Sequence, residues 1–568
     1  MINKITIQNF KSIKDKVEID LKPITLLFGP NSAGKSTVVQ AIHYMKEILE
    51  RNNTDPGKTD LGGEAIELGG FANLVHRTEG DPENHYKYVP IIIGFEITDE
   101  LYPNDHGLLA QGEYDVNTGS VSMRVYYIEV SIEWDDNAGK PIAKKYDVHI
   151  NNEFIGRIEM DGWSVDDSGE EEGSNKWTLS TFMVKTPKFK ISKLNFNHPL
   201  LTWEGNYWLE EGEEEPKHKL KDIIEEIPNN LIDTEDGDIN LFVYYNENSF
   251  PKRPFEIHFE DLLEQSLGPD EILSQSATAV DSIDGVHLNR TLSQIFYTPI
   301  RMLKDMLNDF CYIGPIRTIP ERNFNPERFP ILGRWSDGLG AWDLIYRKYK
   351  SDEESDKAFL KDVNEWMERL DTGYSVIVKE YKEIDIDNPI IMGIDAQGRL
   401  LDDSEDIRRS FEEIPSQIHF QLFEQKNRIY VSSKDIGSGI AQVLPIVVGM
   451  VDWERKFLTV EQPELHIHPA LQQKLADMLI ALTNEDRFIL LETHSEHIML
   501  RLLRRIEETT ENELEKPEYA LKHEDVSIVY VNPTEKGVEM KQLPIDETGE
   551  FTHQWPRGFF TERAEDLL

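Results

Sequence analysis

Residues 24–39 read ITLLFGPNSAGKSTVV, and this stretch decides the fold. An apolar run from Ile24 to Phe28 leads into a loop that matches the pattern GxxxxGK(S/T), and apolar residues then recur from Val38 at helical spacing. A strand, a loop and a helix in this order are typical of a phosphate-binding loop, in which successive main-chain N–H groups turn toward phosphate. The predicted nucleotide-binding residues are Gly29, Pro30, Asn31, Ser32, Ala33, Gly34, Lys35, Ser36 and Thr37.

Two side chains of this loop have specific expected roles. Lys35 reaches the β and γ phosphates of a nucleotide, and the Ser36 hydroxyl ligates magnesium. The glycines permit a backbone path that larger side chains would block. The sequence therefore predicts ATP and Mg²⁺ as ligands.

A second apolar run, Phe457 to Val460, ends in carboxylates, as in a Walker B element. Glu461 is placed to supply the oxygen ligand that magnesium needs, directly or through water. Gln462 comes next, and its amide cannot accept a proton, so we expect any hydrolysis to be slow. Either Glu464 activates the attacking water or Gln462 orients it, while the alternative for Glu464 is a carboxylate that satisfies local N–H groups at a helix N-terminus.

His494 follows a third apolar run, Phe488 to Leu491. A histidine beyond the strand that follows Walker B can hydrogen-bond the γ phosphate and so report its presence. We therefore predict a switch role for His494, with Glu461, Gln462 and Glu464 as the other catalytic candidates.

A serine-glycine turn at Ser438 and Gly439 opens an expected helix before the Walker B run. Such a helix start offers N–H groups and a dipole to a second phosphate. Within one chain this turn would have nothing to bind. In a head-to-tail dimer it would close over the partner's nucleotide, so dimerisation becomes part of the predicted mechanism.

The 568-residue chain is strongly acidic, with 60 Lys and Arg against 105 Asp and Glu and a formal net charge of −45 at pH 7. This surface repels phosphate backbones, so contact with nucleic acid would need a local basic patch. Arg501, Arg504 and Arg505 form one such cluster, with salt bridges to acidic residues as the favoured interpretation.

Cys311 is the single cysteine of the sequence, so no intramolecular disulfide can form, which fits a reducing cytosol. No window approaches 18 consecutive apolar residues. We therefore expect a cytoplasmic protein that has no membrane contact.

The order of the motifs resembles that of the ABC-type ATPases of the SMC, RecF and OLD group. The resemblance rests on NFKSIKD (9–15) with the phosphate-binding loop, DIGSGIAQVLP (435–445), FLTVEQPELHIHP (457–469) and LLETHSEH (490–497). A bacterial AAA-family subset similarly carries YIGPIRTIPER (312–322) and a terminal GFF box, here Trp555 to Phe560. The resemblance implies an ATPase that forms ADP and phosphate. In this family reading Lys35 and Ser36 bind the nucleotide and magnesium, and Glu461 is the Walker B acid. Ser438 and Gly439 act on the nucleotide of the partner chain, and His494 is the switch residue.

The expected fold class is α/β, because apolar strands alternate with amphipathic helices and place a ligand at the carboxyl ends of the strands. The resemblance implies an ABC-type P-loop NTPase head whose N-terminal part is residues 1–80 and whose C-terminal part is residues 305–568. Residues 81–304 read as a β-rich and helical insertion.

OLD-type relatives continue into a Toprim nuclease, and residues 495–568 are too few for that domain. The resemblance therefore implies an ATP-driven dimerising switch or scaffold of a prokaryotic anti-phage defence complex, formed as a homodimer or higher oligomer through its heads. Such a complex controls a separate effector, such as a nuclease, and responds to nucleic acid or a phage protein. The alternatives are a RecF-like repair ATPase that binds DNA directly and a scaffold that binds ATP without turnover.

Overall fold

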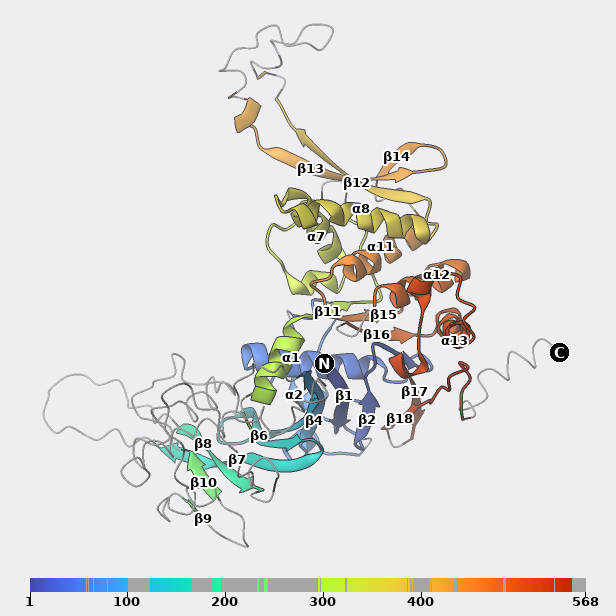
Figure 1. The fold of residues 1–568 in the computed structure, drawn as a ribbon. Helices are drawn as coiled ribbons and strands as arrows, with labels where there is room; N and C mark the ends of the chain where they lie inside the picture. Colours follow the sequence, from blue (N-terminus) through green and yellow to red (C-terminus); the bar gives the residue numbers. More distant parts are fainter. Residues whose placement is uncertain are drawn as a thin grey trace, which may run out of the picture.

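Figure 1 shows the computed structural model of the chain. The structure describes residues 1–57, 59, 61–64, 66–78, 80–100, 123–165, 185–195, 198, 232–233, 240–243, 295–296, 298–321, 324–385, 387–388, 391, 409, 411–432, 435, 437–483, 487–535 and 537–553.

The central sheet has six strands in the order β11-β15-β16-β3-β17-β18. Neighbours pair in parallel, except that β17 and β18 are antiparallel. The strands are β3 (Ile24–Phe28), β11 (Phe310–Ile313), β15 (Phe457–Glu461), β16 (Phe488–Thr493), β17 (Val526–Thr534) and β18 (Gly537–Gln542). The predicted α/β class and the three apolar strands predicted for this sheet are confirmed.

Helices cover both faces of the central sheet (Figure 1). They are α1 (Ser36–Arg51) on one face and α7 (Leu339–Lys350), α8 (Glu354–Arg369), α11 (Ser438–Val451), α12 (Pro469–Ala481) and α13 (Glu496–Thr510) on the other. Successive strand residues alternate between the two cores, so that Leu490 joins the α1 side and Leu491 the other. Both faces are buried, which explains why these strands read as continuous apolar runs. The helix expected at the serine-glycine turn begins at Ser438.

A nine-stranded antiparallel sheet lies against α1, in the order β2-β1-β4-β5-β6-β7-β8-β10-β9. Its strands are β1 (Ile2–Gln8), β2 (Val17–Asp20), β4 (Ile91–Glu100), β5 (Met123–Asp135), β6 (Lys140–Ile150), β7 (Glu153–Val165), β8 (Lys185–Leu194), β9 (Ile232–Asp233) and β10 (Asn240–Val243). Strands β4 to β10 lie within residues 81–304, the part predicted to be a β-rich and helical insertion, and β4 pairs directly with the N-terminal strand β1. The boundaries at residues 80 and 304 stay a prediction.

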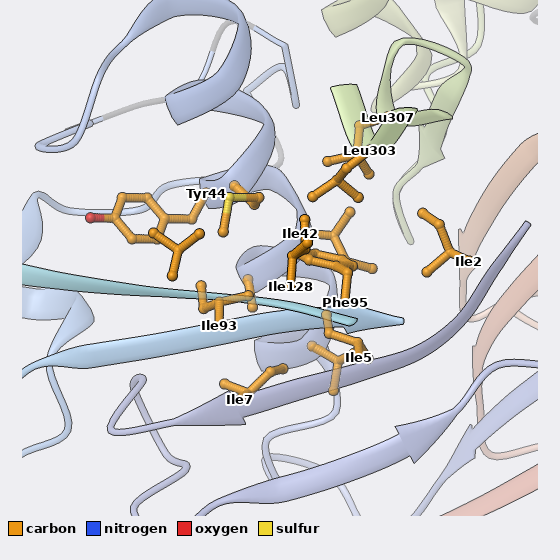
Figure 2. Packing of buried hydrophobic residues seen from close by; sticks show 14 of the residues in the cluster. Ile2, Ile5, Ile7, Ile42, Tyr44, Ile93, Phe95, Ile128, Leu303 and Leu307 are labelled. Atoms are coloured by element: carbon orange, nitrogen blue, oxygen red, sulfur yellow. The ribbon is translucent and has the colours of Figure 1, made fainter. Parts of the chain in front are cut away.

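The core between this sheet and α1 is apolar from both sides. Figure 2 shows Ile5 and Ile7 of β1 and Phe95 of β4 facing Ile42 of α1, with Leu303 from the helical segment 298–308 closing one end. All of these side chains are fully buried. This packing fixes α1, and with it the loop that precedes α1, against a broad rigid support.

A smaller sheet, β12-β13-β14, packs over α8 (Figure 1). It consists of β12 (Tyr374–Lys382), β13 (Ser416–Glu424) and β14 (Ile429–Ser432). A separate short helix, α2 (Phe71–Leu74), lies near the N-terminal strands. β13 and β14 pair antiparallel.

Some predicted features lie outside the described residues. They are the acidic runs 166–173 and 210–215, most of the helical region predicted from 258 and the box from Trp555 to Phe560. Among the helices that the structure describes, none combines the length and apolarity needed to cross a bilayer.

Cys311 gives a direct test of the packing of β11. Its side chain is buried, and burial raises the pKa of its thiol to about 12. Because the thiolate is the reactive form, we expect alkylation of the folded protein at pH 8 to be roughly 1,000-fold slower than alkylation in concentrated urea. Mass spectrometry after timed iodoacetamide treatment measures both rates, and equal rates would show that β11 is not packed as described.

Candidate functional site

The five parallel strands of the central sheet end at one edge, and the predicted motifs follow three of them, β3, β15 and β16. β3 leads into Gly29, while the register pairs Glu461 of β15 with Glu492 of β16 and Thr493 with Phe28. Because the carboxyl ends of parallel strands meet at the same edge, motifs far apart in the sequence become neighbours there.

The loop after β3 depends on glycine. Gly34 has a φ of +96°, and a Cβ at this position would lie 2.4 Å from Ser12 Oγ, so a larger residue would be strained and crowded. Ser12 Oγ also lies 2.9 Å from Thr37 Oγ1, which ties the loop to the turn between β1 and β2. Pro30, Asn31 and Ser32 are exposed at the tip, whereas Ala33 is buried. No side chain caps the start of α1 at Ser36, and such a helix end can bind phosphate.

Lys35 folds its ammonium group into this loop. Its Nζ donates to the carbonyl oxygens of Gly29 at 3.2 Å and Pro30 at 2.9 Å, and it lies 3.9 Å from a Glu492 oxygen. Burial lowers the pKa of Lys35, while the carboxylates of Glu492, Glu464 and Glu461 oppose this effect. The loop therefore holds a buried cation beside the ends of β15 and β16.

Glu461 and Glu492 point to the face of the sheet that carries α1. Phe457 and Leu490, at alternate positions before them, belong to the core on that side. Ser36 Oγ donates to Glu492 at 2.7 Å. Burial and then repulsion by Glu492 raise the pKa of Glu461, and burial raises the pKa of Glu492. The pair therefore resists carrying two negative charges unless a cation joins it.

The oxygen atoms gathered here fit a magnesium ion. Magnesium prefers oxygen ligands and usually combines one or two carboxylates with phosphates and water. The Ser36 hydroxyl and the carboxylates of Glu461 and Glu492 offer such donors. Across the described residues, no group of three or more His, Cys, Asp or Glu side chains is arranged to hold a metal unaided. Phosphate oxygens and water would complete the ligands of a magnesium ion here.

Gln462 and Glu464 lie in the turn after β15. Gln462 has a φ of 45°, and its N–H donates to the Glu492 carbonyl at 2.7 Å. Glu464 accepts hydrogen bonds from Thr493 Oγ1 at 2.8 Å and from the His494 N–H at 2.7 Å. The alternative interpretation of Glu464, a carboxylate that satisfies N–H groups near a helix start, therefore describes its present contacts.

His494 lies directly beside the phosphate-binding loop. Its ring hydrogen-bonds the main chain of Gly29, and burial, followed by the charge of Lys35, lowers the pKa of His494. The imidazole is therefore neutral at pH 7. A neutral ring can donate from one nitrogen and accept at the other, which suits a group that senses a phosphate.

Ser438 and Gly439 open α11 on the opposite side of the turn. A Cβ on Gly439 would lie 2.8 Å from the His466 carbonyl oxygen, so this turn packs closely on the segment after Glu464. The helix start at Ser438 lies at the end of α11 that packs on this segment. The predicted role of Ser438 and Gly439 on a partner's nucleotide stays a prediction.

Sequence reasoning missed three residues of this site. Glu492 contacts Ser36, Tyr312 hydrogen-bonds Glu461, and Arg317 donates to the carbonyl oxygens of Glu461 and Gln462. One signal was available for Glu492, because β16 resembles β15 as a buried apolar strand that ends in a carboxylate. Tyr312 and Arg317 lie in the stretch YIGPIRTIPER (312–322) on which the resemblance rests, but that stretch gave no role for Arg317, whose partners here are main-chain oxygens.

The arginine cluster on α13 is engaged in ion pairs. Arg501 and Arg505 both bind Asp477 of α12, while Arg504 and Arg505 bind Glu508. The favoured prediction of salt bridging is confirmed.

Solved structures of SMC head domains resemble the chain in outline. An SMC head bound to the C-terminal winged-helix domain of ScpA has 10% identity and a TM-score of 0.36, with 96% of this chain and 98% of that chain covered. The SMC head with an extended coiled coil from Pyrococcus furiosus has 10% identity and a TM-score of 0.35, covering 96% of each chain. The SMC head from Thermotoga maritima has 8% identity and a TM-score of 0.32, covering 96% and 99%.

Sequence models identify the family. A model described as AAA ATPase domain matches residues 1–499, and a model described as protein of unknown function (DUF3696) matches residues 521–568. Among curated proteins, none matches the chain. The first match spans most of the sequence and includes the phosphate-binding loop, the serine-glycine turn, the Walker B run and His494, whereas the terminal GFF box lies within the second match. The chain therefore belongs to the AAA ATPase domain family.

Proposed function

We propose that the chain binds ATP with magnesium at the start of α1 and hydrolyses it slowly. One observation carries the proposal: Lys35, Ser36, Glu461 and Glu492 meet where β3, β15 and β16 end. A cationic side chain, an uncapped helix start and paired carboxylates are the groups that a magnesium-bound triphosphate requires.

Each residue has a role that follows from its position. Lys35 binds phosphate oxygens, because its ammonium already lies inside the loop. Ser36, Glu461 and Glu492 would hold magnesium, which neutralises charge on the phosphates. Gln462 orients water without accepting its proton, and Glu464 is occupied by Thr493 and His494, so turnover is slow.

The proposed switch operates between two copies of the chain. Ser438 and Gly439 of one copy close over the nucleotide bound to the other, because the start of α11 offers main-chain N–H groups and a helix dipole to a phosphate. His494, beside Gly29, senses the phosphate that is lost on hydrolysis. Nucleotide state thus shifts an equilibrium between open and closed dimers.

This switch is proposed to serve a prokaryotic anti-phage defence complex by controlling a separate effector, such as a nuclease. Motif order and the resemblance to defence ATPases support this part of the proposal. The alternative with a specific observation in its favour is an ATP-bound scaffold without turnover, because Gln462 directly follows Glu461 and its amide cannot accept a proton from water. Direct DNA binding, as in RecF, has less support, because Arg501 and Arg505 are neutralised by Asp477.

Phosphate release in the presence of magnesium and ATP tests the activity. We expect the purified chain to release phosphate above the level of Lys35→Ala, and sedimentation to show a nucleotide-dependent dimer. Nucleotide binding and dimerisation without phosphate release would favour the scaffold. Absence of both nucleotide binding and dimerisation would refute the proposal.

A further inference from the structure

Arg317 joins two parts of the site that the sequence analysis treated separately. It lies in the loop after β11, and its side chain is 2% exposed. One terminal nitrogen donates to the Glu461 carbonyl at 2.6 Å and to the Gln462 carbonyl at 3.4 Å. The other donates to the Gln442 carbonyl on α11 at 3.4 Å. One buried guanidinium therefore bridges the turn after β15 and the helix that starts at Ser438.

Gln442 reinforces this bridge from its own side. Its amide nitrogen donates to the Arg317 carbonyl at 2.9 Å, and its amide oxygen accepts from the Arg317 N–H at 3.3 Å. Gln442 lies one helical turn after Ser438, on the same face of α11. A shift of the start of α11 would therefore either break the hydrogen bonds between Gln442 and Arg317 or move Arg317.

The turn that Arg317 holds has a backbone that needs support. Gln462 adopts a φ of 45°, a conformation that non-glycine residues rarely keep without external bonds. Its N–H is held by the Glu492 carbonyl, and its own carbonyl is held by Arg317. The orientation of this peptide sets where the side chains of Glu461 and Gln462 point.

The guanidinium of Arg317 does not use all of its donors within the described part of the chain. Here Nε of Arg317 is buried, and it has no hydrogen-bond partner among the described residues. The carbonyl oxygens of two separate elements, the turn after β15 and α11, therefore set the position of the guanidinium. Its Nε donor forms no hydrogen bond among the described residues.

We infer that Arg317 is a positioning residue that couples the serine-glycine turn to Glu461 and Gln462. When a partner's nucleotide draws in the start of α11, Gln442 and Arg317 carry that displacement to the turn after β15. This inference rests on the proposed ATPase function and adds the path by which dimer closure controls turnover.

Arg487 provides a matched control. It is also 2% exposed, it also donates to main-chain carbonyls (those of Met450, Asp452, Arg455 and Leu482), and burial lowers its pKa, like that of Arg317, to about 10. It precedes β16, at the edge of the sheet opposite the nucleotide site. Replacing it removes an equivalent buried charge away from the chemistry.

The test compares Arg317→Met and Arg317→Lys with Arg487→Met. We expect both Arg317 variants to lower kcat by about 100-fold and to change the Kd for ATP by less than about threefold, because a small misplacement of reacting groups affects the chemical step. Lysine keeps the charge but has no planar fork, so it should not rescue turnover. Arg487→Met should lower the melting temperature and leave kcat unchanged for the folded fraction.

Adding Gln442→Ala to Arg317→Met tests the coupling. If the two residues act as one unit, the double variant should turn over no more slowly than Arg317→Met alone. Multiplicative losses, or equal loss of kcat in Arg487→Met, would overturn the inference. A wild-type protein that binds ATP and dimerises without any turnover would refute the ATPase proposal, and the inference would fall with it.

Discussion

Lys35→Ala should weaken ATP binding by about 100-fold and abolish phosphate release. The ammonium is the cation that the loop directs at phosphate, and a hydrogen bond to a charged group contributes about 1.5–3 kcal/mol. The substitution also leaves the carbonyls of Gly29 and Pro30 without the donor that bridges them. Calorimetric titration with ATP and magnesium measures the affinity.

A control separates loss of the ammonium from general damage to the fold. Lys474→Ala removes a lysine of α12 whose partner is Asp371, on an exposed surface. This variant should bind ATP with wild-type affinity. Equal affinities for Lys35→Ala and the wild type would show that the loop after β3 does not bind the triphosphate.

Glu461→Gln and Glu492→Gln should each lower turnover by at least about 100-fold while stabilising the nucleotide-free protein. Loss of a magnesium ligand removes charge stabilisation worth several kcal/mol. Each substitution also removes one charge from a buried pair of like charges, whose pKa values burial has raised. Melting temperatures with EDTA and turnover with magnesium measure the two effects.

The stabilisation should depend on pH with a definite sign. A carboxyl whose folded pKa is raised loses stability as the pH rises from its ordinary range through the raised pKa. The advantage of both glutamine variants should therefore grow between pH 6 and pH 9. A constant difference across this range would show that the two carboxylates are not the strained pair described here.

Glu508→Gln is the opposite case and serves as the control. Burial raises the pKa of Glu508, but hydrogen bonds from Arg504 and Arg505 outweigh this effect and leave its pKa lowered. Its removal should cost stability at neutral pH and leave turnover unchanged. A loss of turnover in this variant would mean that α13 takes part in the chemistry.

The sequence predicted best those parts of the fold that are built from residues adjacent in the chain. The path from Ile24 through Lys35 into α1 is contiguous, so strand, glycine loop and helix could each be recognised from adjacent residues. The same holds for the apolar runs of β15 and β16, because burial on both faces leaves a continuous apolar signature.

The contacts that sequence did not predict depend on register. Glu492 becomes a neighbour of Glu461 and Ser36 only when β16 lies between β15 and β3. Arg317 is harder still, since it binds carbonyl oxygens, which every residue possesses. Side-chain chemistry alone cannot reveal such a partner, whereas strand order and helix position can.

The strand order also affects how the protein is made. β3 lies between β16 and β17, so the ribosome completes the first loop of the site long before either neighbouring strand exists. At about 5–20 residues per second, synthesis from Ile24 to Ile489 takes roughly 20–90 s. During this interval an apolar strand has unpaired edges, and the nascent chain lacks Glu492, so the carboxylate pair that would hold magnesium is incomplete. We therefore expect nascent chains to need chaperone protection and to acquire nucleotide only near the end of translation.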